Sequence, residues 1–282
     1  MTILKLIKIE WFKTFSKTRT YISFAAIFVV LALTFIGIIY DSGDFIEKTP
    51  TFNFLNSNFI IKGNIVNGYF ISQLIMYFLM VHIPFLIALV AGDIVAGESN
   101  AGTFRIMLIR PPSRFQILIS KAIVSLLYSM LLIAFMGILS ICFGVLIFGV
   151  GDLLVVSKGF LIISRHDVFF RFLLAYPLAM ISMMVVASLA FLFSVLVENA
   201  IGPIVGTMAV VVISVIITET PITLFQKIRP FLFTTYSKVW EFSFLQPIPV
   251  NSIITSVLYL FVFMFIFFAI AFIIFMRKDI LS

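Results

Sequence analysis

Charged residues are scarce in this sequence. Only 11% of the 282 residues are Asp, Glu, Lys or Arg, whereas 62% are hydrophobic and 16% are aromatic. An average soluble domain is roughly 25% charged, and one core in water could not cover so many Phe, Ile, Leu and Val side chains. The composition therefore excludes an ordinary soluble protein and predicts a chain embedded in a lipid bilayer.

Cysteine and the common catalytic motifs are also lacking. The single cysteine, Cys142, lies inside an apolar run, which excludes an intrachain disulfide framework and a thiolate metal cluster. The sequence contains no G-x4-G-K-[ST] loop to hold ATP phosphates, no H-E-x-x-H and no G-x-S-x-G,. We therefore expect a chain that is not an enzyme by itself and binds no cofactor and no metal.

The positive charge is arranged along the chain in a way that indicates membrane topology. The net charge is +7, which is also compatible with nucleic-acid binding. The basic residues, however, border apolar runs and do not form one solvated face. We expect no nucleic acid among the partners.

Six apolar runs are long enough to cross a bilayer, which takes about 20 residues of helix. They predict an all-α integral membrane protein built as one domain over residues 1–282. The predicted spans are about 21–40, 69–92, 122–150, 172–197, 200–218 and 253–276.

An even number of spans places both termini on the same side. If that side is the cytoplasm, the cytoplasmic segments contain eleven of the 19 Lys and Arg residues, and the other eight are spread over longer loops. The positive-inside rule then predicts a multi-pass protein of the cell membrane with cytoplasmic N- and C-termini.

Residues 1–20 predict an amphipathic helix at the inner membrane surface. Its apolar positions recur at helical spacing, at Leu4, Ile7, Trp11 and Phe15. Its lysines project from the other side, at Lys5, Lys13 and Lys17. Two roles remain open for this helix: an anchor whose lysines meet anionic membrane lipids, and a gating or docking element.

The loop between the fifth and sixth spans, residues 219–251, combines aromatic rings, cations and four prolines. Rings and long cations suit the headgroup layer, and prolines interrupt a continuous span. We expect short interfacial or re-entrant helices there, with a loop merely adsorbed to the membrane as the alternative.

Residues 92–121, between the second and third spans, carry the most informative pattern. Gly97 and Gly102 permit turns, and Thr103 can cap a short helix over 104–109 that Pro111 and Pro112 end,. Ser113 and Gln116 then have the spacing of a capping box that restarts helix into the third span. The pattern predicts a short cytoplasmic helix parallel to the membrane and joined to two spans.

This segment resembles the E-x3-G-T…L…P-x-R…K cytoplasmic signature of ABC-2 type permeases, the transmembrane subunits of ABC transporters. The matching positions are Glu98, Gly102, Thr103, Leu108, Pro111 or Pro112, Arg114 and Lys121. The double proline departs from the single one that is typical. The order of elements along nearly the whole chain resembles the same family.

The resemblance implies half of an ATP-driven exporter for a hydrophobic or amphipathic substrate. Its partners would be separate ABC ATPase subunits, which bind ATP and Mg, and a second permease copy or homologous permease. Within the coupling segment 98–114, the part near Gly102 to Ile109 would be the coupling helix that contacts the ATPase, and Glu98 and Arg114 would brace its ends. The coupling residues would be Glu98, Gly102, Thr103, Phe104, Arg105, Arg110 and Arg114; alternatively, these charges are solvated loop residues that cap helices.

Three other features have a structural and a functional interpretation. Glu198 lies in a tight inner turn between the fourth and fifth spans, where it either shapes the turn or serves as an ATPase contact or a gate. Gly202 and Gly206 form a small-x3-small pair that favours close helix packing, with the permease dimer contact as one location. His82, two residues before Pro84, is expected to be a hydrogen-bonded interior side chain, with a proton relay as the alternative.

Two rival functions remain. One is a non-transporting membrane sensor or scaffold that binds an extracellular ligand through its outer loops. The other is an ion-coupled secondary transporter, which would carry paired intramembrane charges or two related halves; neither is evident in the sequence.

Overall fold

The computed structural model describes residues 2–40, 66–101, 113–156 and 159–277. These residues form an all-α membrane protein in which six helical segments are long and apolar enough to cross a bilayer. The segments are α2 (Thr18–Tyr40), α5 (Gly68–Ala91) continued by α6 (Asp93–Asn100), α8 (Arg114–Phe148), α9 (Arg165–Leu196), α10 (Gly202–Glu219) and α13 (Val250–Arg277). The six predicted spans are confirmed, although the third and fourth helices begin at 114 and 165 and not at 122 and 172.

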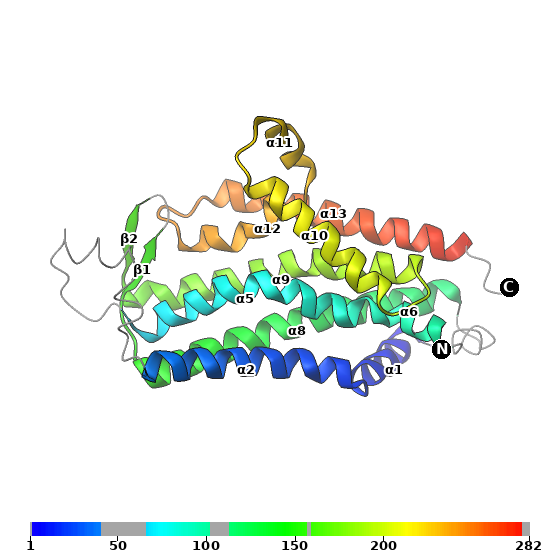
Figure 1. The fold of residues 1–282 in the computed structure, drawn as a ribbon, viewed down its shortest axis with the longest axis horizontal. Helices are drawn as coiled ribbons and strands as arrows, with labels where there is room; N and C mark the ends of the chain where they lie inside the picture. Colours follow the sequence, from blue (N-terminus) through cyan, green and yellow to red (C-terminus); the bar gives the residue numbers. More distant parts are fainter. Residues whose placement is uncertain (1, 41–65, 102–112, 157–158, 278–282) are drawn as a thin grey trace.

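The long helices run side by side along the length of the molecule (Figure 1). Helix α9 packs against α5, α8, α10 and α13. Of its most apolar stretch of 18 residues, 78% is buried. The corresponding fraction is only 11% for α13 and 22% for α2 and α10. Helix α9 is therefore the centre of the bundle, and the other three present apolar faces outward, as expected where lipid is the solvent.

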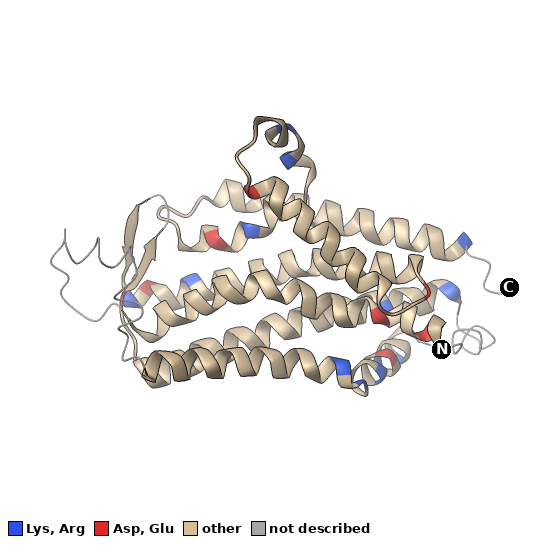
Figure 2. Ribbon diagram, in the orientation of Figure 1, with Lys and Arg blue, Asp and Glu red and all other residues tan. Residues whose placement is uncertain are grey.

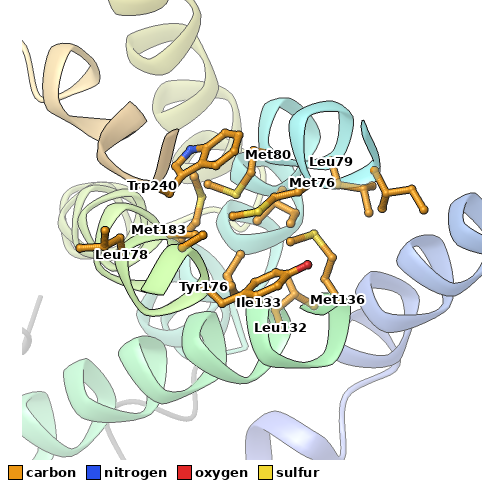
Figure 3. Packing of buried hydrophobic residues seen from close by; sticks show 14 of the residues in the cluster. Met76, Leu79, Met80, Leu132, Ile133, Met136, Tyr176, Leu178, Met183 and Trp240 are labelled. Carbon is orange, nitrogen blue, oxygen red and sulfur yellow. The ribbon is translucent and has the colours of Figure 1, made fainter. Parts of the chain in front are cut away.

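Buried methionines, aliphatic side chains and aromatic rings fill the space between α5, α8 and α9 (Figure 3). The helices α5 and α8 approach closely at a pair of glycines. A Cβ added to Gly68 would lie 2.3 Å from the backbone carbonyl of Gly144, so only glycine permits this crossing. Next to it, Ser72 Oγ lies 2.8 Å from Ser140 O.

The two ends of the bundle differ in structure. We call one the charged end: it contains α1 (Ile3–Phe15), α6, the start of α8 and the end of α13 (Figure 1). We call the other the hairpin end, because β1 (Leu153–Val156) and β2 (Phe160–Ile163) pair there in antiparallel register, with Leu153 opposite Ile163. This hairpin was not predicted, and its β-branched runs lie in a stretch that we expected to be loop.

The segment between α10 and α13 forms short helices, as predicted. They are α11 (Thr223–Ile228), η1 (Arg229–Phe231), α12 (Thr234–Ser237) and η2 (Lys238–Phe244). Helix α11 projects from the bundle in Figure 1, whereas η2 packs on α9 and buries Trp240 and Phe244. The alternative of a loop merely adsorbed to the membrane is therefore wrong for η2.

Candidate functional site at the charged end

Helix α1 turns an acidic side chain toward the bundle. Its buried residues are Leu6, Glu10 and Thr14, spaced one helical turn apart,. The predicted apolar stripe is split as a result: Ile7 and Trp11 pack on the bundle, whereas Leu4 is 78% exposed. Three of the four predicted apolar positions, Ile7, Trp11 and Phe15, thus pack on the bundle beside the buried Glu10.

Four charged side chains from three segments form a closed ring, which we call the charge ring: Glu10, Lys13, Glu98 and Lys121. Lys121 Nζ lies 2.6 Å from Glu10 Oε2 and 2.7 Å from Glu98 Oε2. Lys13 Nζ lies 3.0 Å from Glu10 Oε1 and 3.1 Å from Glu98 Oε1. Each carboxylate thus contacts both ammonium groups, and α1, α6 and α8 are joined by charge.

Lys121 is the innermost member of the ring and has no exposed side-chain surface. Besides the two carboxylates, its ammonium donates to the backbone carbonyl of Ile94 at 3.3 Å. Glu10 Oε2 and the Ile94 carbonyl accept hydrogen bonds from this ammonium, and Glu98 Oε2 is its second ion-pair partner. Burying a charge costs several kcal/mol unless it is paired in this way, and Lys121 therefore depends on both acids.

Lys13 closes the ring on its outer side. Partial burial lowers the pKa of Lys13, but the nearby Glu10 and Glu98 carboxylates raise it by more, so that its pKa lies above the ordinary value. Lys13 is consequently cationic at neutral pH. With two cations and two anions, the charge ring has no net charge.

A second ionic contact joins α6 to the junction between α1 and α2. Asp93 Oδ2 lies 2.8 Å from Lys17 Nζ, and Asp93 Oδ1 lies 2.6 Å from Arg19 Nη1. A Cβ added to Gly97 would lie 2.5 Å from the same carboxylate. Gly97 was predicted to permit a turn; it lies within α6 instead, and its missing side chain leaves room for Asp93.

Helix α6 is also attached to the central helix α9. Ser194 Oγ accepts hydrogen bonds from the backbone amides of Val95 and Ala96, at 3.1 and 2.9 Å. These amides lie in the first turn of α6, where no carbonyl of the same helix is available to them. Helix α6 is thus held by α1, α8 and α9 together.

The predicted coupling residues fall into two groups. Glu98 is in the charge ring, and Arg114 is half-buried as the first residue of α8. The predicted capping box before it is confirmed, because Gln116 N donates to Ser113 Oγ and Ser113 N donates to Gln116 Oε1, both at 3.2 Å. The remaining residues, Gly102, Thr103, Phe104, Arg105 and Arg110, lie outside the described residues.

The other predicted features are placed as follows. Glu198 is exposed in the short connection between α9 and α10. A Cβ on Gly202 would lie 2.7 Å from Val197 Cγ1, and one on Gly206 would lie 3.3 Å from the ring of Phe193. Both glycines therefore pack closely within this chain, and their place in a permease dimer stays a prediction.

His82 was expected inside the bundle, and that expectation was wrong. Its imidazole is exposed, with Nδ1 2.8 Å from the Phe78 carbonyl one turn earlier. The ring also lies 4.5 Å from the Phe78 ring, centroid to centroid. Local bonding to the backbone satisfies this side chain without an interior partner.

Sequence reasoning missed Glu10 and Asp93. A signal for Glu10 was present, since it is the only acidic residue among the first 40 and follows Lys5 and Lys8. A single carboxylate in a basic membrane-proximal helix indicates an internal cationic partner, because ionisable side chains near the bilayer core are usually paired inside the protein. No comparable local signal marks Asp93.

The arrangement is suited to a mechanical role. Among the described residues, no group of three or more His, Cys, Asp or Glu side chains could hold a metal ion. Glu10 and Glu98 are also occupied by two lysines. What the charge ring does is fix α1, α6 and α8 relative to one another at one end of the bundle (Figure 2).

The comparisons with known proteins place the chain in one family. A curated relative, "Uncharacterized protein YhcI" of Bacillus subtilis (strain 168), is 35% identical over 118 residues, which is 40% of this chain. This chain spans 37% of the length of that relative. The family described as "Protein of unknown function (DUF2705)" matches residues 26–281. Since this match covers nearly the whole sequence, the chain belongs to the DUF2705 family.

Proposed function

We propose that this chain is the permease subunit of an ATP-driven ABC exporter and that the segment 98–114 couples it to a separate ATPase. One observation carries the proposal: the two ends of that segment are joined to each other. Glu98 is its first residue, Lys121 follows its last residue on α8, and their charged groups lie 2.7 Å apart. A partner that pushes on the segment would therefore move α6 and α8 as a unit.

The surrounding contacts extend this unit to the membrane-spanning part. Glu10 and Lys13 add α1 to it, and Ser194 adds the central helix α9. A displacement at the charged end would then reach the helices that face a translocation route. Such a transfer needs a rigid base, because a flexible segment would absorb the motion.

The partners follow from the same proposal. The ATPase subunits would bind ATP and Mg, and a second permease would complete the route for a hydrophobic or amphipathic substrate. The outward apolar faces of α10 and α13 offer surface for that second copy. The charged end would face the cytoplasm at the cell membrane, since it carries Lys13, Lys17, Arg19 and Lys121,.

The test is reconstitution with an ATPase. The chain is purified from its native membranes, a co-purifying protein with a G-x4-G-K-[ST] loop is identified, and both are placed in lipid vesicles. We expect ATP hydrolysis that depends on the chain and is lost in Gly102→Trp. The matched control is Gly159→Trp in the β-hairpin, where an added Cβ meets nothing within 4 Å.

Three outcomes would contradict the proposal. These are absence of any phosphate-loop ATPase, hydrolysis that is independent of the chain, and equal hydrolysis in the two tryptophan variants. A cellular role that persists after the ATPase is inactivated would favour the sensor or scaffold function instead.

A further inference from the structure

The outer face of α1 combines apolar and cationic side chains. Leu4 and Phe12 are 78% and 75% exposed, and Lys5 and Lys8 are exposed beside them. Helical geometry places these four residues on one side, because Leu4, Lys8 and Phe12 follow one another at intervals of four and Lys5 lies three positions before Lys8,. The buried Glu10 lies on the opposite side.

The charges of α1 and α6 are sorted by sign. Their acids Glu10, Asp93 and Glu98 all point inward and are paired with cations. Among the described residues, neither Lys5 nor Lys8 takes part in an ion pair. The outward surface of α1 therefore combines apolar side chains with charges of positive sign only. It complements a surface that is both apolar and anionic.

We propose that this face of α1 binds anionic phospholipids of the adjacent leaflet. Only Ser16 and Lys17 separate α1 from the membrane-spanning helix α2, so α1 is held within a few residues of the bilayer boundary. At that level Leu4 and Phe12 enter the acyl-chain region, while the two ammonium groups reach headgroup phosphates. An acidic soluble protein would match the lysines but would leave the adjacent apolar side chains unexplained.

The bound lipids also support the charge ring. The same helix presents Lys5 and Lys8 to lipid and Glu10 and Lys13 to the ring, on opposite sides. Lipid binding on the outer face therefore favours the position of α1 in which Glu10 contacts Lys121. This inference does not depend on the proposed permease function, since it concerns lipid contact alone.

Trp11 on the same helix reports the lipid contact. The chain has two tryptophans, so Trp240→Phe leaves Trp11 as the only indole. The protein is reconstituted in two kinds of phosphatidylcholine vesicle. One contains brominated phosphatidylglycerol and the other contains brominated phosphatidylcholine, at the same mole fraction. In both brominated lipids the bromine atoms lie on the acyl chains near the carbonyl. We expect stronger quenching of Trp11 by the brominated phosphatidylglycerol, and a weaker preference at high salt.

The lysines are then removed in the same background. Lys5→Gln with Lys8→Gln should lower the preference for phosphatidylglycerol by about fivefold for each lysine, with the circular dichroism spectrum unchanged. The control Lys227→Gln, an exposed position in α11, should keep the full preference. Equal quenching by both lipids, quenching by neither, or an unchanged preference in the double variant would each overturn the proposal.

Discussion

The two ends of the bundle hold their peripheral segments by different chemistry. At the charged end, side chains contact side chains across long stretches of sequence, as Lys121 and Glu10 do at 2.6 Å. At the hairpin end, the contacts that hold the hairpin and η2 run from side chains to the backbone. Asn67 Nδ2 donates to Asp152 O at 2.7 Å, and Arg171 Nη1 donates to the carbonyls of Ser243 and Leu245 at 3.1 and 2.8 Å.

The two kinds of contact differ in whether they depend on a particular partner side chain. A backbone carbonyl is present whatever the sequence, so a cap such as Arg171 fixes a segment without a matching partner residue. The charge ring requires all four members, since the loss of one leaves a buried charge with fewer partners. At the hairpin end, each attachment is therefore independent of a partner side chain. At the charged end, the positions of α1, α6 and α8 depend on one another, because each supplies part of the same ring.

The largest effect should come from breaking the ring at its buried member. Lys121→Met keeps the side-chain length but leaves Glu10 and Glu98 with Lys13 as their shared partner, so we expect a loss of about 3–5 kcal/mol. Unfolding of the purified protein in detergent, followed by circular dichroism, measures it.

The control for this prediction is Lys227→Met, an exposed position in α11, which should be near neutral. Adding Glu98→Gln to Lys121→Met should restore part of the loss, because one fewer carboxylate then lacks its buried partner. A loss below about 1 kcal/mol in Lys121→Met would mean that the ring is not a stabilising joint.

A smaller loss is expected at the hairpin end. Arg171→Met removes two charge-assisted hydrogen bonds to the end of η2. We expect the free energy of unfolding to fall by about 2 kcal/mol. This value already allows for the partial exposure of the arginine. The same unfolding measurement applies, with Arg165→Met as the control on an exposed position of the same helix. A loss as large as that of Lys121→Met would remove the distinction between the ends.

Local signals in the sequence were sufficient for the spans and for several caps. Apolar length alone located all six helices, because a bilayer imposes that length on any spanning helix. The box formed by Ser113 and Gln116 was equally predictable, since its two partners are three residues apart. Only the starts of α8 and α9 were misplaced, where helix continues beyond the apolar run into polar residues.

The charge ring could not be predicted in the same way. Glu10 and Lys121 are 111 positions apart, and no local pattern reports a contact of that separation. The sequence identified Glu98 and Lys121 through a family resemblance but gave neither of them a partner. The inward rotation of α1 also escaped prediction, because the apolar residues of that helix are spread around it and Glu10, with its buried cation, decides which side faces the bundle.

The smallest expected effect has the opposite sign and sharpens the contrast most. Burial raises the pKa of Glu241 in η2; nearby Lys238 lowers it and Glu219 raises it further, and the net pKa lies above the ordinary value of 4.5. Lys238 Nζ lies 2.7 Å from Glu219, so this cation is shared. As pH rises from about 4.5, the unfolded carboxyl loses its proton first, and stability falls until the folded carboxyl has ionised as well.

Glu241→Gln should therefore stabilise the protein at neutral pH, and the gain should vanish in acid, as unfolding midpoints measured across pH will show. Glu198→Gln, at an exposed position in the connection between α9 and α10, is measured alongside it as the matched control. A destabilised Glu241→Gln at neutral pH would mean that both ends use their carboxylates as attachments.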